Sequence, residues 1–283
     1  MHRFSPFIIR FLLLLQLCVS AGRAEPTYKA LSIGVNEYDG DQGWSPLAFP
    51  ESDAFRLGEL LEDAYGFEQV TILKGKKKTA GPVLRDTLKE FFLEAEEDDH
   101  LVVFFAGHGT ALLEGEDRGG YWIPSSGTRE PDTWIPVDDL RDWMMESPAH
   151  QVLLISDSCY AGSFFTRGLQ VVRRDPGEEK EGLVERLMSK PSRFVLTSGD
   201  FEEVPDKSAF TESILRELSR EQDFLSAEDL YFRIKRDVYE QTGTQVLAKE
   251  MLEDTAGGNL VLRQTRVPKP DSTLVLRIFP PVP

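Results

Sequence analysis

Two residues of this sequence, Cys159 and His108, have the side chains of a nucleophile and its acid/base partner. A thiol attacks a carbonyl group only after it loses its proton, and a neighbouring imidazole can accept that proton or stabilise the thiolate. Cys159 comes directly after Asp157 and Ser158, whereas His108 lies between two glycines. Positions 108 and 159 are 51 apart, so the fold must bring the two side chains together. Such a pair predicts acyl transfer through a thioester.

An apolar run precedes each of these two residues and predicts a buried strand. Residues 152–155 lead to the cysteine, and residues 101–106 lead to the histidine. Continuous apolar runs of this length are typical of parallel strands that are covered on both faces. In an open α/β sheet, chemistry takes place just beyond the carboxyl ends of the strands. We therefore expect Cys159 and His108 to meet at that edge of a sheet.

The rest of the chain alternates predicted strands with predicted helices. Further strands are expected at 28–34, 69–73, 121–123, 193–197, 245–247 and 259–263. Helices are expected at 51–65, 82–97, 137–146, 181–189, 211–219 and 227–240. This alternation predicts a doubly wound α/β sandwich with a mostly parallel sheet. The proline-rich tail contains one more strand-like segment, at 273–279, with no obvious pairing partner.

The first 24 residues have the order of parts of a secretion signal. Arg3 and Arg10 accompany an apolar run at 11–19, and small residues at Gly22 and Ala24 predict cleavage after Ala24. The run is shorter than the roughly 20 apolar residues that a membrane-spanning helix needs. We expect a secreted or periplasmic protein that leaves the membrane after cleavage. An uncleaved anchor is the alternative.

Cleavage of this signal would leave one cysteine in the mature chain. The sequence has two cysteines, and Cys18 would leave with the signal. A single cysteine in an exported protein suggests a reactive thiol or an intermolecular bridge. An inert buried cysteine is the alternative, but the position of Cys159 after a strand favours reactivity.

Two other kinds of site fit the residues poorly. Structural zinc needs four ligands that usually come in closely spaced pairs, and the mature chain would keep one cysteine and three histidines without such a pair. The segment 107–109 is too short for a phosphate-binding glycine loop. His100 and His150 come just before predicted strands, so we expect them at the surface.

The charge of the chain is strongly acidic. Its formal net charge is −16, and the signal contains three arginines and no acids, so its removal changes the value to −19. This charge argues against nucleic-acid binding, which needs basic surface. It suits a peptide or protein substrate with basic residues, although acidic surfaces often serve solubility alone.

Several segments resemble the caspase family, and more closely its metacaspase and bacterial caspase-like branches. They read ALSIGVN at 30–36, PESDA at 50–54, VVFFAGHG at 102–109, YWIP at 121–124 and ISDSCYAG at 155–162. SAFT at 208–211 and GGNL at 257–260 resemble the small-subunit region of the family. The resemblance implies a three-layer sandwich in which about six strands, mostly parallel, have helices on both faces.

The resemblance also implies an organisation of the chain into parts. A caspase-like peptidase domain at 25–263 would follow the signal peptide at 1–24 and precede a tail at 264–283. Within the domain, a large-subunit-like part would end at about 166 and a small-subunit-like part would occupy 183–263. The intervening linker, about 167–182, has no clear period and suits proteolysis. We expect the enzyme to cut itself there, after Arg173, Arg174 or Arg167.

The family's site residues map onto five positions of this sequence. The resemblance implies that Cys159 is the nucleophile, that His108 is the general acid/base, and that the backbone N–H groups of Gly109 and Cys159 form the oxyanion hole. It also implies that Asp157 and Asp53 line the primary specificity pocket. Two carboxylates there would favour arginine or lysine before the cut. A turn role for Asp157 and a helix first-turn role for Asp53 are the alternatives.

Some metacaspases bind calcium through several aspartates, and this sequence matches that set only in part. Asp138 and Asp139 correspond to two members, but Thr166 stands where a further acid is expected. Acids also suit the first turn of a predicted helix. We favour this interpretation and expect no cofactor.

These observations predict an exported, caspase-like cysteine endopeptidase that cleaves after arginine or lysine. The alternative is a caspase-fold interaction or regulatory protein with little or no peptidase activity. The presence of both Cys159 and His108 favours the enzyme.

Overall fold

The computed structural model describes residues 26–39, 43–114, 119–159, 164, 180–199, 206–243, 246–252 and 257–267. The expected signal peptide, the cut sites at Arg167, Arg173 and Arg174, and the strand-like segment at 273–279 lie outside these residues. Within the described residues, no helix combines the length and the apolar character needed to cross a membrane.

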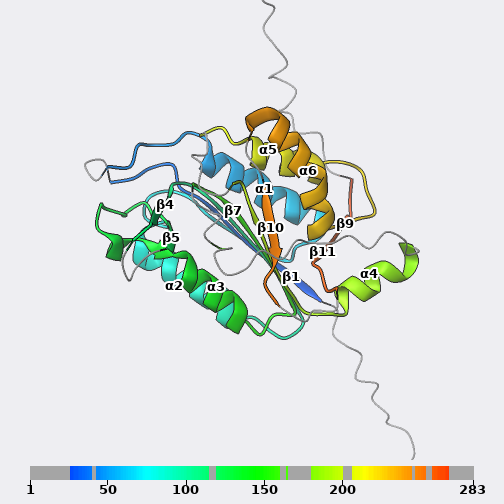
Figure 1. Cartoon of the computed structure of the whole chain (residues 1–283). Coiled ribbons are helices and arrows are strands. Elements are labelled where there is room, and N and C mark those ends of the chain that lie inside the picture. Colours follow the sequence, from blue (N-terminus) through cyan, green and yellow to red (C-terminus); the bar gives the residue numbers. More distant parts are fainter. Residues whose placement is uncertain are drawn as a thin grey trace, which may run out of the picture.

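A six-stranded sheet with the order β10-β8-β7-β3-β1-β2 forms the centre of the molecule (Figure 1). Its parallel strands are β1 (Thr27–Gly34), β2 (Gln69–Leu73), β3 (Asp99–Ala106), β7 (Gln151–Asp157) and β8 (Ser192–Thr197). The edge strand β10 (Leu247–Glu250) runs antiparallel to β8. This sheet confirms the predicted α/β class.

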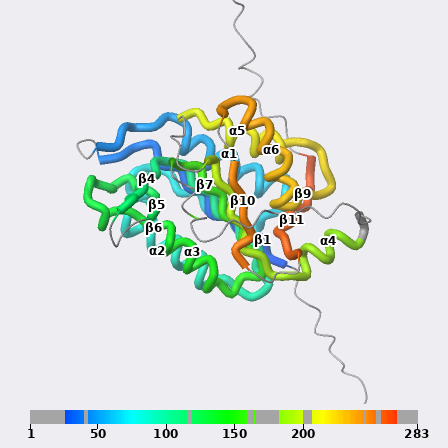
Figure 2. Tube along the Cα trace, in the orientation of Figure 1, coloured from blue at the N-terminus to red at the C-terminus, as the bar shows by residue number. Residues whose placement is uncertain are grey.

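Helices cover both faces of the sheet (Figures 1 and 2). One face packs against α1 (Pro50–Tyr65), α5 (Ala209–Leu218) and α6 (Ala227–Thr242). The other packs against α2 (Gly81–Leu93) and α3 (Val137–Glu146). Successive residues of a strand point to opposite faces, so Phe104 of β3 joins the first core and Phe105 the second. Burial of each ring contributes about 1.5–3 kcal/mol to the stability of the fold. The two rings therefore hold in place the strand that leads to His108.

Smaller elements surround this sandwich. A three-stranded sheet of β4 (Gly109–Leu112), β5 (Gly119–Trp122) and β6 (Ile135–Pro136) follows the end of β3. The 3-10 helix η1 (Pro131–Thr133) precedes β6, and α4 (Lys180–Met188) precedes β8. Strand β9 (Phe224–Ser226) pairs with β11 (Val261–Arg263) in a sheet of their own.

Three expectations about these elements were wrong. The helix expected at 82–97 ends at Leu93, because the chain turns toward β3 and Asp99 Oδ2 accepts a hydrogen bond from the Glu96 N–H at 2.7 Å. The strand expected at 245–247 is β10, at Leu247–Glu250. The segment expected as a strand at 259–263 is shorter and pairs with β9, outside the central sheet.

The two histidines expected at the surface have other positions. Strand β3 begins at Asp99, so His100 is part of the sheet and only 2% exposed. Its ring lies 4.9 Å from the ring of Tyr28 and 5.7 Å from that of His150. His150 is half-buried, and its Nε2 lies 2.9 Å from the Met188 carbonyl oxygen. Both histidines are therefore packing residues at the amino ends of the strands.

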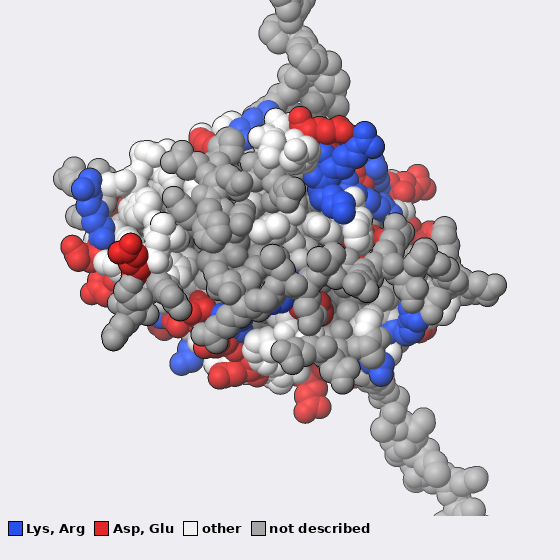
Figure 3. All heavy atoms as spheres, in the orientation of Figure 1, with Lys and Arg blue, Asp and Glu red and all other residues white. Residues whose placement is uncertain are grey.

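Acidic and basic side chains are interspersed on the surface. On the face shown in Figure 3, basic side chains gather over α6 and acidic ones lie among and around them. Several of these charges form ion pairs, such as Arg236 with Glu240 at 2.7 Å and Arg216 with Asp237. Solvent screens exposed pairs of this kind, so they contribute little to the stability of the fold.

Candidate active site

The pairing of β3 with β7 brings the segments that carry His108 and Cys159 together. These strands are parallel neighbours, with Ala106 opposite Asp157. The Gly107 N–H donates to the Asp157 carbonyl at 3.3 Å, which continues the pairing by one residue. His108 and Cys159 each follow their paired strand end by two residues. The structure therefore places both at the carboxyl edge of the sheet.

Both residues line one pocket at this edge. The full lining consists of Leu47, Pro50, Asp53, Ala106, Gly107, His108, Asp157, Cys159, Asp206 and Ser208. The pocket thus combines all four side chains that the sequence suggested for catalysis and specificity. It also contains Asp206, which local sequence patterns did not indicate, and Ser208, which belongs to the SAFT segment.

Hydrogen bonds hold His108 in a defined orientation. Its Nε2 lies 2.8 Å from the Ser45 carbonyl oxygen. A carbonyl oxygen only accepts, so Nε2 carries a proton in this contact and Nδ1 is the nitrogen left to exchange one. The His108 backbone N–H donates to the Tyr38 hydroxyl at 2.8 Å, and this hydroxyl donates to the Val35 carbonyl at 3.2 Å.

Two aromatic rings restrict the His108 imidazole further. The ring of Tyr38 lies 4.8 Å from it and the ring of Trp44 lies 5.6 Å from it, measured between centroids. The indole N–H of Trp44 donates to the Thr128 carbonyl at 3.0 Å, and that of Trp134 donates to the same oxygen at 2.8 Å. Trp44 lies between the strand predicted at 28–34 and the helix predicted at 51–65, outside both, so its contact with His108 was not predicted.

A buried hydroxyl network supports the turn that carries Cys159. The Trp122 indole N–H donates to Ser156 Oγ at 2.9 Å, and Ser156 Oγ lies 3.1 Å from Ser158 Oγ. Trp122 itself stacks on Phe105, with centroids 4.1 Å apart and planes 6° apart. Cys159 is a thiol of intermediate exposure, so solvent and ligands can reach it.

Gly109 packs directly against the Cys159 turn. A Cβ atom added at this position would lie 2.2 Å from the Cys159 carbonyl oxygen and 3.1 Å from the Ser158 side chain. Real Cβ atoms do not approach other atoms that closely. Gly109 is therefore required for space beside the Cys159 turn.

Asp157 is buried below the thiol at the end of β7. It is 4% exposed, and Thr211 Oγ1 of α5 donates to its Oδ2. Burial raises the pKa of Asp157, and the hydroxyl groups of Ser208, Thr211 and Ser198 oppose that shift. Its other oxygen, Oδ1, is buried without a hydrogen-bond partner among the described residues. Buried polar atoms in native proteins nearly always have partners, so Oδ1 is suited to accept from a ligand.

Asp53 lies beside Asp157 in the first turn of α1. It is also 4% exposed, and Arg56 Nη1 approaches its Oδ1 at 3.4 Å. Burial raises the pKa of Asp53 to about 7; the charge of Arg56 opposes this shift, and the charges of Asp157 and Glu212 add to it. Arg56 divides its charge between Asp53 and Glu212, whose Oε1 lies at 2.8 Å. The two aspartates thus place two carboxyl groups at the base of the pocket.

The two aspartates considered for calcium have other partners. Asp138 forms an ion pair with Arg141 at 2.6 Å, and Asp139 forms one with Arg85. Both acids lie in the first turn of α3, where negative charge stabilises a helix. Among the residues described, no three histidine, cysteine or acidic side chains are grouped as metal ligands.

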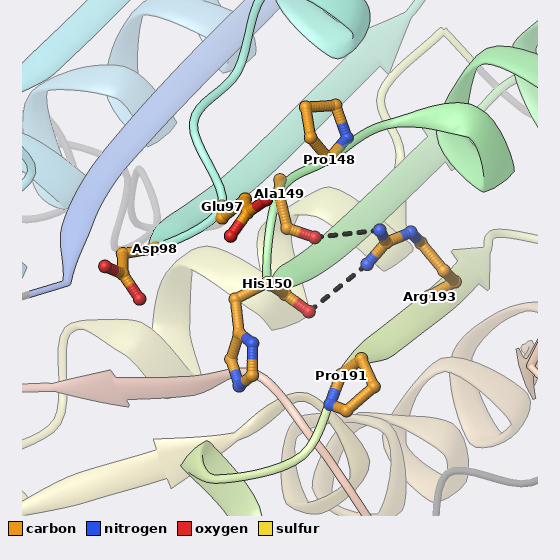
Figure 4. Close-up of a pocket in the computed structure, with 7 residues that line it drawn as sticks. All are labelled: Glu97, Asp98, Pro148, Ala149, His150, Pro191 and Arg193. Atoms are coloured by element: carbon orange, nitrogen blue, oxygen red, sulfur yellow. Dashed lines mark hydrogen bonds between the residues drawn. The ribbon is translucent and has the colours of Figure 1, made fainter. Parts of the chain in front are cut away.

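A second pocket lies at the opposite edge of the sheet (Figure 4). Its lining consists of Glu97, Asp98, Pro148, Ala149, His150, Pro191 and Arg193. Arg193 is 5% exposed and donates to the carbonyl oxygens of Met144, Ser147, Ala149, His150 and Ser192 at 2.7–3.2 Å. Burial lowers the pKa of Arg193, and the charge of Glu250 opposes this. Because backbone carbonyls occupy its guanidinium group, Arg193 ties loops together and is not available to a ligand.

Comparison with known protein families identifies a caspase domain that covers most of the chain. The model of the caspase domain matches residues 27–277. Metacaspase-4 of Arabidopsis thaliana is 29% identical over 168 residues, which are 55% of this chain and 38% of that protein. The chain therefore spans well under half the length of this curated relative.

Solved structures resemble the fold over most of the chain. Protein GSU0716 from Geobacter sulfurreducens has a TM-score of 0.56 at 17% identity, and the alignment covers 86% of this chain and 98% of that one. Caspase-1 from Spodoptera frugiperda has a TM-score of 0.55 at 14% identity, with 81% and 88% covered. At such identities the likeness concerns the fold alone.

Proposed function

The chain belongs to the caspase family, and we propose that it is a cysteine endopeptidase that cleaves after arginine or lysine. The observation that carries the proposal is the pocket at the carboxyl edge of the sheet. It brings a thiol, an oriented imidazole and two buried carboxylates together from three separate segments of the chain.

In the proposed reaction, Cys159 and His108 act as a pair. The thiol passes its proton to His108 Nδ1, and Sγ attacks the substrate carbonyl carbon. The negative charge on the carbonyl oxygen is stabilised by the backbone N–H groups of Gly109 and Cys159. His108 then gives its proton to the leaving amine as the peptide C–N bond breaks. Water, deprotonated by His108, hydrolyses the thioester and restores the thiol. The Ser45 carbonyl supports this cycle because it keeps Nε2 protonated and Nδ1 in place.

Preference for a basic residue follows from the charge of the pocket. Asp157 Oδ1 has no hydrogen-bond partner among the described residues, and Asp53 adds a second carboxylate beside it. A guanidinium group offers paired N–H donors that match carboxylate oxygens, whereas an ammonium group acts as a point charge. Arginine is therefore the expected first choice.

A peptide-library cleavage profile of the protein and of Asp157→Asn tests this preference. We expect the wild-type protein to cleave after arginine or lysine, and the variant to lose about tenfold or more in kcat/KM on basic substrates, the scale of one charge-assisted hydrogen bond. Cleavage after aspartate, or a variant that keeps the basic preference and rate, would contradict the proposal.

The rival proposal is a caspase-fold interaction protein that does not hydrolyse peptides. A thiol-directed peptide probe separates the two. If the protein is an endopeptidase, the probe should label Cys159 of the wild-type protein. The His108→Ala variant should be labelled much more slowly. Equal labelling of the two proteins, together with an inert library, would favour the interaction protein.

The raised pKa of Asp53 predicts that the basic preference depends on pH. A carboxyl group is charged above its pKa, and burial raises the pKa of Asp53 to about 7. The contribution of Asp53 is therefore present above pH 7 and is lost as the pH falls through that value. Between pH 8 and pH 6, we expect the ratio of kcat/KM for an arginine substrate to that for its uncharged citrulline analogue to fall about tenfold, as the charged fraction of one such group does.

The citrulline ratio isolates the pocket from the dyad, since any change at the dyad affects both substrates alike. Asp53→Asn provides the matched control because its amide does not titrate. A ratio that is flat in the wild-type protein, or equally steep in Asp53→Asn, would exclude this role for Asp53.

Further properties of the enzyme belong to the same proposal. We expect it to be exported, to act on peptide or protein substrates, and to need no metal. The ion pairs of Asp138 and Asp139 support a structural role for these two acids. Self-cutting after Arg173, Arg174 or Arg167 agrees with the proposed basic preference.

A further inference from the structure

We propose that Asp206 is a positioning residue that closes one wall of the specificity pocket and thereby holds His108 in place. This inference rests on the proposed peptidase function. It concerns a contact between the segment that follows β8 and the segment that precedes α1, two parts of the chain that meet beside the thiol.

The carboxylate of Asp206 binds two backbone N–H groups before α1. Its Oδ1 and Oδ2 each accept from the Ala48 N–H at 2.9 Å, and its Oδ1 accepts from the Phe49 N–H at 3.3 Å. Phe49 is the N-cap residue of α1 and offers no side-chain cap of its own. Asp206 therefore supplies, from 158 positions away, the negative acceptor that a helix start favours.

The segment bound by Asp206 is the one that orients the imidazole. Ser45 places its carbonyl oxygen 2.8 Å from His108 Nε2, and Trp44 packs on the His108 ring. Leu47, between these residues and the Asp206 contact, lines the pocket. A shift of this segment would change the wall of the pocket and the position of His108 at the same time.

The other end of the contact is tied to Asp157. Ser208, two residues after Asp206, lines the same pocket. At the start of α5, its Oγ accepts a hydrogen bond from the Thr211 N–H at 3.3 Å. Thr211 Oγ1 donates to Asp157. The segment 206–211 therefore connects the acidic base of the pocket with the loop that carries Ser45. Through Asp206, the part of the chain after β8 takes part in holding the general acid/base.

Asn36 also anchors this loop, so loss of Asp206 should loosen it without unfolding the protein. Asn36 accepts from the Leu47 N–H through its backbone oxygen at 2.8 Å, and its side chain donates to the Ala48 carbonyl at 3.3 Å. Asp206 itself is exposed. We therefore expect Asp206→Ala to affect turnover much more than the melting temperature.

The test compares Asp206→Ala and Asp206→Asn with the wild-type protein and with Asp63→Ala. Asp63 is an exposed acid of α1 at the far end of the helix from the pocket, so its replacement removes the same charge. Two experiments are made. The first measures kcat and KM on an arginine peptide. The second measures how the rate of Cys159 alkylation by iodoacetamide depends on pH, because this rate reports the thiolate and hence the pairing of Cys159 with His108.

We expect Asp206→Ala to lower kcat/KM about five- to tenfold, less than the roughly hundredfold that a misplacement of 1 Å can cost, and to shift the pH profile of alkylation. Asp206→Asn should recover part of both, because its amide oxygen still accepts from the Ala48 N–H. Asp63→Ala should match the wild-type protein.

Two results would overturn the inference. If Asp206→Ala equals the wild-type protein in turnover and alkylation, the contact does not position His108. If Asp206→Asn is as impaired as Asp206→Ala on the arginine peptide while alkylation is unchanged, Asp206 acts on the substrate charge directly. A wild-type protein that cleaves no peptide would refute the proposed function instead, and the alkylation profiles would still decide whether Asp206 positions His108.

Discussion

Cys159→Ala is expected to abolish peptide hydrolysis while leaving the fold intact. The substitution removes the only atom of the pocket that the proposed reaction uses to form a covalent bond, and a methyl group cannot replace it. Cys159 follows the end of β7 and is half-exposed, so little packing is lost. Hydrolysis of an arginine peptide measures the first effect, and circular dichroism with a melting curve measures the second.

His108→Ala is the companion of this variant. Loss of a general acid/base costs about 10²–10⁴ in rate, so a small residual turnover is expected where Cys159→Ala shows none. Near-normal turnover by either purified variant would rule out the dyad. A Cys159→Ala protein that is unfolded would leave the decision to His108→Ala, because the His108 side chain is only half-buried.

Gly109→Ala is expected to lower kcat strongly although it changes no side chain with chemistry of its own. The added Cβ would lie 2.2 Å from the Cys159 carbonyl oxygen, so the Cys159 turn or the start of β4 must move. Both segments carry N–H groups proposed for the oxyanion hole. Misplacement of one such donor costs about 10²–10³ in kcat. Steady-state kinetics on the arginine peptide measures this loss.

Gly119→Ala is the matched control for this substitution. Gly119 lies in β5, which pairs with β4, but a Cβ there would meet no atom within 4 Å among the described residues other than its chain neighbours. The control should keep its activity. If Gly109→Ala were as active as Gly119→Ala, the close approach of Gly109 to the thiol turn would have no part in catalysis.

The elements that carry the dyad were predictable because their signal is local. Residues 101–106 and 152–155 are apolar at every position, as strands covered on both faces require, and the structure contains both as β3 and β7. Polar residues directly after such strands point to the carboxyl edge. The positions of His108 and Cys159 at that edge follow from this rule. Boundaries were less predictable, since Asp99 and His100 are polar and yet belong to β3.

The supports of the site were not predictable because they depend on long-range contacts. The Ser45 carbonyl that orients His108 is a backbone atom, so no residue type reveals it. Trp44 contacts His108 only because the segment before α1 folds over the end of β3. The contact of Asp206 with Ala48 joins positions 158 apart. Patterns within a strand or a helix contain no information about such pairs.

The pairing of β7 with β8 has a consequence for a chain that is cut between them. These neighbours lie inside the central sheet and pair from Gln151 with Ser192 to Ser156 with Thr197. Residues from both sides of such a cut also share one core, which includes Leu153 and Ile155 before it and Phe194 and Leu196 after it. Cutting would break covalent continuity and leave a complex of two fragments whose strands lie side by side in one sheet. Separation of the fragments would require the sheet to split through its middle, so a cut molecule would behave as a single particle even at high dilution.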